Sequence, residues 1–237
     1  MQQINTRLSR GQYDAARQAL IARNLNPDKA VLTSSFLRSE AQFATTSLTT
    51  PTSTNYTFGF QINQVSTNSS GAPFNTERRL ALQDGFMITE IGVFIGKPSS
   101  ATDVNWRKYA YGNPAVFSSA NVATSMNGLF EHGFLSLAID NAVVLPAWDL
   151  SRHFSVGITQ QSTWATTPTT GSLVSPVDQF DGTTTGYYPV GSNIWFTGGQ
   201  NINLQINAAA AITACEAYSR IIVITRGILA QNILAGK

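Results

Sequence analysis

The sequence is poor in charged residues. Only 12% of its 237 residues are Asp, Glu, Lys or Arg, about half the usual share for a soluble domain. Ser, Thr, Asn, Gln and Gly fill the difference, so the surface is expected to be polar but nearly uncharged. Little electrostatic repulsion would then keep copies of the chain apart. The composition favours secreted binding modules, fibres and self-assembling proteins over a typical cytosolic enzyme.

Cysteine and long apolar runs are also scarce. Cys215 is the only cysteine, so no intramolecular disulfide can form, and its setting in AITACEAY predicts a small buried side chain. The opening MQQINTRLSR lacks the apolar stretch of a signal peptide. No segment approaches the roughly 18–20 apolar residues of a membrane span. We therefore expect a soluble chain that is made in a reducing cytoplasm.

Motifs that carry catalysis are absent. The sequence has no GxSxG, GxGxxG or GxxxxGK[ST] segment, so neither a nucleophile elbow nor a phosphate-binding loop is predicted. His132 and His153 stand apart, and with one cysteine they do not provide the three or four close ligands of a zinc site. Each histidine is expected to pack at a loop or a strand end. We predict no catalytic residue, no metal and no cofactor.

Two acidic features are weaker hints of chemistry. Glu90 is the single charge in GFMITEIGVFIG, but an acid catalyst needs a partner in a cleft. Pairing with Arg78 or Arg79, or exposure to solvent, is the favoured interpretation. DQFDG places Asp178 and Asp181 as in half of a calcium loop. Because calcium needs six or more oxygen ligands, a turn stabilised by Asp side chains is favoured there.

What the sequence does contain is one long helical pattern near its start, with an apolar stripe and several arginines. Pro27 is expected to end this helix. Residues 1–40 hold six basic and three acidic residues, against nine and ten in the remainder. We interpret residues 1–29 as a basic amphipathic arm with a linker. The stripe is Tyr13, Leu20, Ile21 and Leu25, and the basic positions are Arg7, Arg10, Arg17 and Arg23.

From residue 30 onward the apolar period changes to two, which is the spacing of strands. TNYTFGFQINQV alternates cleanly, whereas GFMITEIGVFIG is apolar on both faces and predicts a strand that is covered on both sides. FLSLAID and AVVLPAW flank Asn141 as a tight pair, and RHFSVGIT predicts another strand. ANVATSMNGLFEHG predicts a short helix that ends at Gly133. Residues 160–193 are rich in Thr, Gly and Pro and predict a long loop.

These patterns set the fold class. About nine or ten strands without helix–strand alternation predict an all-β antiparallel sandwich or jelly roll over residues 30–237. A single barrel is favoured, and a double barrel stays open. The helical arm precedes this domain.

Aromatic residues in the predicted loop raise a second class of function. Trp164, Tyr187 and Tyr188 could stack on sugars in a lectin-like module, as could tryptophans elsewhere in the chain. Aromatic anchors in a core or at a subunit interface are the commoner role, and we favour that role here.

The segment FNTERRLALQDGFMITEIGVFIGKPSS resembles capsid proteins of small tailless icosahedral bacteriophages. The arginine pair, LQD and the strand ending GVFIGKP carry the likeness, and YGNPAVFSSAN and AWDLSRHF extend it. The resemblance implies a jelly-roll subunit of the virion, made in the host cytoplasm. It implies assembly with copies of itself and with other virion proteins around a genome, and no active site. Many coat proteins of this kind have two barrels, whereas the strand count fits one better.

The basic helix then has three interpretations. Its apolar stripe could dock on a neighbouring subunit, which we favour. Its arginines could contact phosphates of packaged nucleic acid or of an internal membrane. In the third interpretation the helix packs on its own barrel with a solvated polar face. As the runner-up function, a carbohydrate- or receptor-binding module of a phage fibre would use the 160–193 loop instead.

Overall fold

A computed structural model describes residues 10–43, 56–62, 80–100, 103, 106, 108–110, 120–154, 186–208 and 215–233. In these residues eight strands form two four-stranded antiparallel sheets. Sheet 1 has the strand order β1-β8-β3-β6, and sheet 2 has the order β2-β7-β4-β5. The elements are α1 (Arg10–Ile21), β1 (Val31–Gln42), β2 (Tyr56–Ile62), β3 (Gly85–Gly96), α2 (Ala120–His132), β4 (Phe134–Ile139), β5 (Ala142–Asp149), η1 (a 3₁₀ helix, Ser151–His153), β6 (Tyr187–Thr197), β7 (Ile202–Ala208) and β8 (Arg220–Gln231).

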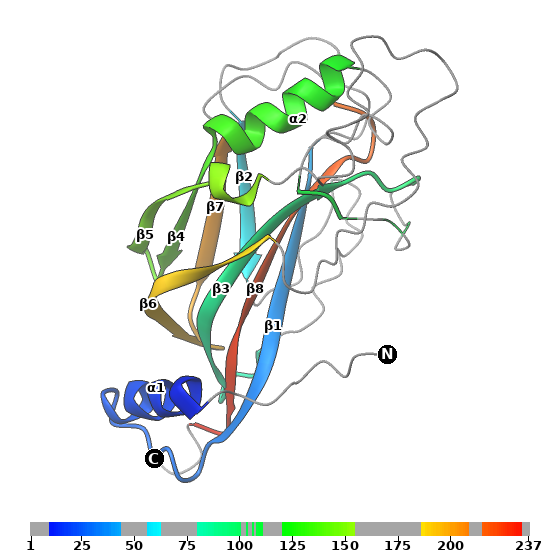
Figure 1. Cartoon of the computed structure of the whole chain (residues 1–237). Coiled ribbons are helices and arrows are strands. Elements are labelled where there is room, and N and C mark those ends of the chain that lie inside the picture. The colour runs from blue at the N-terminus through cyan, green and yellow to red at the C-terminus, as the bar shows by residue number, and fades with distance from the viewer. Residues whose placement is uncertain are drawn as a thin grey trace.

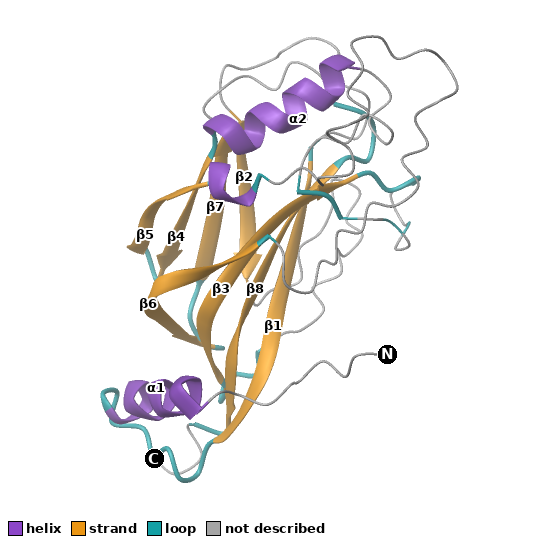
Figure 2. Ribbon diagram, viewed as in Figure 1, coloured by secondary structure: helices purple, strands orange, loops and turns teal. Residues whose placement is uncertain are grey.

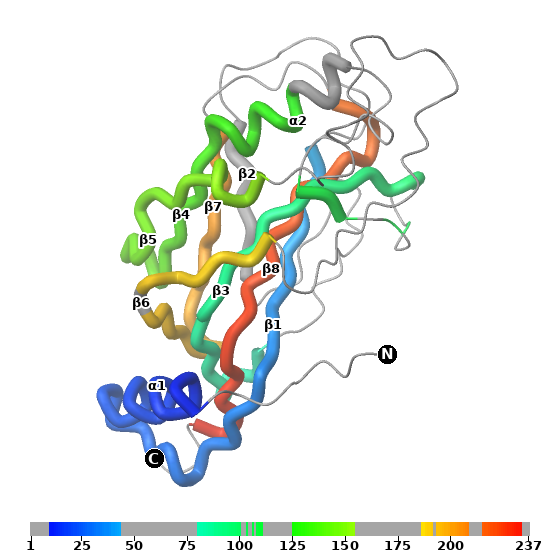
Figure 3. The backbone as a smooth tube through the Cα atoms, in the orientation of Figure 1, coloured from blue at the N-terminus to red at the C-terminus, as the bar shows by residue number. Residues whose placement is uncertain are grey.

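The two sheets enclose one large apolar core (Figure 1). Sheet 1 contributes Phe86 and Phe196, whose ring centroids lie 5.8 Å apart, and sheet 2 contributes the alternating buried positions of β4 and β7. The helices lie towards opposite ends of the sandwich (Figure 2). Phe130 of α2 is buried in the core, so this helix closes one end. The other helix, α1, lies by the far end of sheet 1 (Figure 3).

Strand β3 is buried on both faces, as its apolar sequence predicts. A register shift between Ile88 and Glu90 exchanges the two faces along its length. Before the shift Phe86 and Ile88 point into the core, and after it Ile91, Val93 and Ile95 do. An extra residue in one strand has this effect because side chains alternate with period two. The bulge therefore places Glu90 on the outer face instead of in the core.

A tight hairpin joins β4 to β5. Asp140 and Asn141 both have positive φ, at 49° and 69°, which is the geometry of a two-residue type I′ turn. The Asp140 carboxylate accepts hydrogen bonds from the Gln200 side chain at 2.8 Å and from the Asn201 backbone at 2.9 Å. The predicted pairing around Asn141 is confirmed, and its turn is tied to the start of β7.

The all-β antiparallel class is confirmed, and so are the strand at residues 56–62, the double-faced strand β3 and the helix that ends before Gly133. Two predictions need correction. Arg152 and His153, the first two residues of the strand predicted from RHFSVGIT, lie in the 3₁₀ helix Ser151–His153, and residues 187–193 belong to β6 instead of the predicted 160–193 loop. Residues 155–185 lie outside the described residues. Within the described part, neither helix combines the length and the apolar content that crossing a bilayer requires.

Candidate interaction surface

Helix α1 packs on the outer face of sheet 1. Ala16 and Leu20 are fully buried there against Met87 of β3, Trp195 of β6 and Ile228 of β8. The helix approaches closely because the residues it presents are small: Ala15 and Ala19 flank the buried pair. Gly85, directly beneath the Trp195 ring, has no room for a side chain. Residues far apart in the sequence thus form the surface on which the helix packs, which we call the helix seat. The helix packs on its own chain, as in the third interpretation of the arm.

The end of α1 is set by asparagine, not by the proline expected to stop it. Asn24 adopts φ 56°. The Leu25 N–H donates to the Leu20 carbonyl at 3.0 Å, and the Asn24 N–H donates to the Ile21 carbonyl at 2.9 Å. These two bonds define a Schellman motif, which Asn can form because it tolerates the left-handed conformation. The motif turns Leu25 back onto the helix seat, where it is partly buried.

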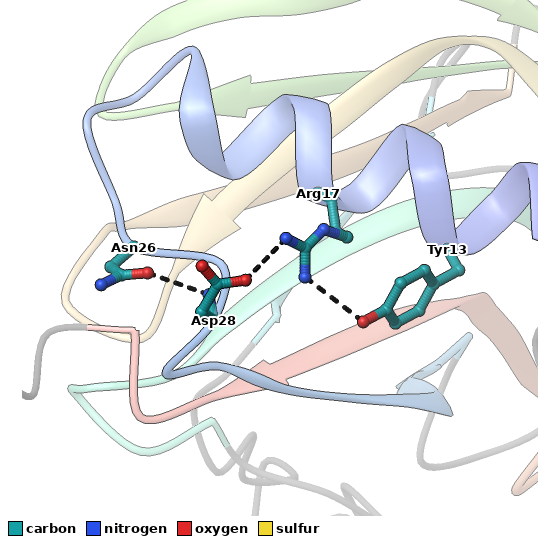
Figure 4. A network of polar contacts seen from close by, with 4 residues as sticks. All are labelled: Tyr13, Arg17, Asn26 and Asp28. Carbon is teal, nitrogen blue, oxygen red and sulfur yellow. Dashed lines mark hydrogen bonds and ion pairs between the residues drawn. The ribbon is translucent and has the colours of Figure 1, made fainter.

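A polar network fixes the linker to the helix (Figure 4). Arg17 donates to the Asp28 carboxylate at 2.6 Å and to the Tyr13 hydroxyl at 3.4 Å. The Asp28 N–H donates to the Asn26 side-chain oxygen at 2.9 Å, forming a turn. Asp28 and Tyr13 hold the pKa of Arg17 above its ordinary value by hydrogen bonding to the charged form. Because the network is exposed to solvent, its contribution is orientation more than stability.

The other predicted arginines differ in their surroundings. Arg10 is almost fully exposed and lies 4.0 Å from Asp14. Arg23 donates to the Ala19 carbonyl at 2.9 Å and lies over the Trp195 ring, 5.7 Å from its centre. Arg7 lies outside the described residues. The three described arginines, Arg10, Arg17 and Arg23, are therefore not gathered into one phosphate-binding cluster.

The residues of the predicted apolar stripe differ in how far they are buried. Leu20 was expected to contact a neighbouring subunit, but it is fully buried within its own chain, and this prediction needs correction. The physical reason is that Trp195, Met87 and Ile228 already supply the apolar surface that Leu20 needs. Tyr13 and Ile21 are 40% and 50% exposed and remain available on the helix.

Beyond the residues that α1 covers, the outer face of sheet 1 carries charges and aromatic rings. Glu40 of β1 is buried and pairs with Arg38 and, at 3.1 Å, with Arg220 of β8. Arg38 lies over the Trp106 ring. The sequence signal for this cluster was Arg38-Ser-Glu40, because residues two apart in a strand share a face, but its partner Arg220 is distant in sequence.

A second charged pair lies nearer to α1. Arg226 is 3.8 Å from Glu90 and lies 3.4 Å from the centre of the Tyr187 ring. The described partner of Glu90 is thus Arg226, whereas Arg78 and Arg79 lie outside the described residues. Burial raises the pKa of Tyr187, so its hydroxyl stays neutral at physiological pH. Tyr187 also packs edge-on against Phe94. It was predicted as a loop residue, and the structure places it in β6.

Tyr188 belongs to a buried cluster around His153. The His153 Nε2 accepts from the Trp148 indole N–H at 2.9 Å, and its Nδ1 lies 3.1 Å from the Gly186 carbonyl. Because a carbonyl only accepts, Nδ1 carries the proton. Burial lowers the pKa of His153 from 6.5 to about 4. The Tyr188 ring packs edge-on against the imidazole. The prediction that this histidine packs at a strand end is confirmed.

The remaining site predictions are outside these contacts. Trp164, Asp178 and Asp181 lie outside the described residues, and so nothing tests a sugar platform or a calcium loop there. Among the described residues, no group of three or more His, Cys, Asp or Glu side chains could hold a metal ion. Cys215 is buried, as predicted. Compared with known proteins, the chain matches no protein-family model, no curated protein and no solved structure. Function is therefore inferred from the residues and topology of the chain itself.

Proposed function

We propose that this chain is a virion structural protein that folds as a single jelly roll: the major capsid protein of a tailless icosahedral phage. The observation that supports it most is the strand pairing. β1 pairs with β8, β2 with β7, β3 with β6 and β4 with β5, all antiparallel. These four pairs are the pairs of one long hairpin. One arm of the hairpin runs from β1 to β4, and the other runs back from β5 to β8. The additional pairs β3·β8 and β4·β7 wrap that hairpin into two sheets.

This wrapping is what a jelly roll of eight strands requires, and viral capsid domains and lectins use that fold. Eight described strands in two sheets of four fit one barrel and leave no strand over for a second. The weakly charged composition and the likeness to phage capsid proteins then favour the capsid role over the lectin role. A self-assembling shell subunit works through its interfaces, so the proposal includes no catalytic residue and no cofactor.

The aromatic residues also favour the capsid role. Trp148 donates to His153, Trp195 lies beneath α1, and Trp106 lies under Arg38. Tyr187 and Tyr188 pack within the same chain. Each of these rings contributes to the fold, which leaves only Trp164 of the aromatic residues singled out above for the alternative, a sugar-binding fibre module.

In this proposal the exposed side of α1 contacts neighbouring subunits or other virion proteins through Tyr13 and Ile21. Arg7 and Arg10 remain for phosphates of packaged nucleic acid or of an internal membrane. Because α1 covers Met87, Trp195 and Ile228, deleting the helix would expose an apolar surface and confuse loss of function with loss of folding. Substitutions on the exposed side of α1 avoid that problem.

The test is sedimentation velocity with negative-stain microscopy of the purified chain over a range of concentration and salt. We expect closed shells or large rings. The double variant Tyr13→Ser, Ile21→Ser should reduce their yield, whereas Leu82→Ser, at an exposed apolar residue outside the helix, should not. A monomer or trimer that does not assemble at high concentration and that binds glycans on an array would contradict the proposal and support the fibre module.

A further inference from the structure

The outer face of sheet 2 differs from the outer face of sheet 1 in its chemistry. Since Ile202, Leu204 and Ile206 of β7 point into the core, the intervening residues point outward. β4 alternates in the same way, and the register places β2 positions beside β7. The outward positions include Asn203 and Gln205 of β7 and Phe134, Ser136 and Ala138 of β4.

This face carries almost no charge. Asp149, at one end of β5, is the only Asp, Glu, Lys or Arg in the four strands of sheet 2. Its carboxylate accepts a hydrogen bond from the Ser151 hydroxyl, which lowers the pKa of Asp149 and anchors the charge to η1. A partner with a strong charge of either sign would find no complementary group here. A second copy of the same neutral face meets no repulsion.

The side chains on this face also complement themselves. Each Asn and Gln amide has both donors and an acceptor, so amides of two copies can satisfy one another in more than one relative orientation. Beside the amides, the register places two exposed apolar side chains on this face: Phe134 at 38% and Val143 at 62%. Burying them against a second copy would add apolar contact without burying an unpaired charge.

One of the two edge strands of this sheet, β5, is unsuited to pairing with another strand. β5 pairs with β4 on one side, its register slips twice, and Pro146 within it has no N–H to donate. An association through the face of sheet 2 is therefore favoured over one through its β5 edge. Four strands about 4.8 Å apart and seven residues of about 3.3 Å each give a flat face of roughly 450 Å². Stable pairs usually bury about 800 Å² per partner, so one such contact is weak.

We infer that the outer face of sheet 2 is a contact surface for a second copy of this chain, weak in a single pair and effective when repeated in an assembly. The inference rests on the proposed function, because a shell subunit is one that meets many copies of itself. Weak individual contacts that act together are also what lets an assembly form and correct itself.

The first experiment measures how fast a maleimide labels a cysteine that is introduced on the surface. Cys215 is buried, so an introduced surface cysteine becomes the reactive one. Two variants are treated with a maleimide, both as dilute subunits and as assembled particles. They are Val143→Cys on sheet 2 and Thr33→Cys at an exposed position of β1 on sheet 1. We expect labelling of position 143 to slow at least about tenfold on assembly, with a much smaller change at position 33.

A second variant tests the same surface by charge. Gln205→Lys places a like charge at the centre of the face in every copy and should weaken self-association at least about tenfold, measured by sedimentation. Thr33→Lys is the matched control. Circular dichroism melts of both variants check that the fold is retained, which is expected because position 205 points away from the core.

The outcomes separate the two proposals. If particles form and position 143 labels as fast as in dilute subunits, the sheet 2 contact is wrong and the capsid role stands. If labelling slows equally at both positions, protection is general and the assignment to sheet 2 is also wrong. If the wild-type chain never self-associates, both proposals fail. Selective protection of position 143 together with a weakened Gln205→Lys variant supports the contact.

Discussion

The two outer faces of the sandwich differ in the number of charged residues that their strands carry. Six of the residues in the eight strands are Asp, Glu, Lys or Arg, and five of them lie on sheet 1: Arg38, Glu40, Glu90, Arg220 and Arg226. Each is in an ion pair within the chain. The outer face of sheet 1 is thus stabilised internally, by a helix and by charge pairs. By contrast, the described strands of sheet 2 carry a single charged residue, Asp149, and no helix is described on their outer face.

The comparison predicts that stability is concentrated on sheet 1. The largest effect should come from Glu40→Ala, because Arg38 and Arg220 would stay buried without their shared carboxylate. We expect a loss of about 3–5 kcal/mol in the free energy of unfolding, measured with denaturant. Glu90→Ala, on the same face but with its side chain 39% exposed, should cost less than about 1 kcal/mol. Equal losses would mean that burial of the pair is not what matters.

The seat of α1 gives the next effect. Leu20→Ala leaves a cavity against Trp195 and Ile228, and should destabilise the chain by about 2–4 kcal/mol. Tryptophan fluorescence should shift to longer wavelength as water reaches Trp195. The neighbouring Ile21→Ala, at an exposed position, is the control and should change stability by less than about 0.5 kcal/mol. If the two variants behave alike, α1 is not seated on its own sheet in solution.

Acid should weaken the link between the two sheets at the edge formed by β5 and β6. His153 bonds to Trp148 of β5 and to Gly186, the residue before β6. Its folded pKa of about 4 lies below its ordinary 6.5, so the unfolded chain binds the proton first as pH falls. Stability is therefore complete above about pH 6.5 and decreases by about 3 kcal/mol towards pH 4.

The measurement is the urea midpoint at a series of pH values. His153→Phe keeps the ring but removes the titrating group, so the variant should lose most of the dependence between pH 6.5 and 4, although it is less stable at neutral pH. A wild-type profile that is flat over this interval would contradict the buried neutral histidine.

The smallest effect is predicted for the face of sheet 2. Gln205→Ala should leave the unfolding free energy within about 0.5 kcal/mol of the wild type, because it removes no buried contact of the isolated subunit. Calorimetry of dilute protein would measure it. A loss above about 1 kcal/mol would mean that Gln205 supports the fold itself, and the contrast between the two faces would then be smaller than the structure indicates.

Local patterns predicted much of the fold, and distant pairings limited the rest. Period-two alternation located the strands, and Asn141 located a hairpin whose geometry depends on two neighbouring residues. The start of β6 was missed because YYPVGSN is rich in turn-forming residues, and only pairing with β3 makes it a strand. The sequence predicted helix α1 correctly, but it did not predict the surface on which the helix packs. Trp195 and Ile228, which receive it, lie far along the chain and carry no local mark of that role.

The pairing of the first strand with the last also sets an order of events in folding. Glu40 and Arg220 are separated by 180 positions. Until β8 has been synthesised, β1 lacks its partner strand, and the buried carboxylate has only Arg38 beside it. Contacts of such long range form late and slowly. A chain that lacks β8 therefore cannot complete sheet 1.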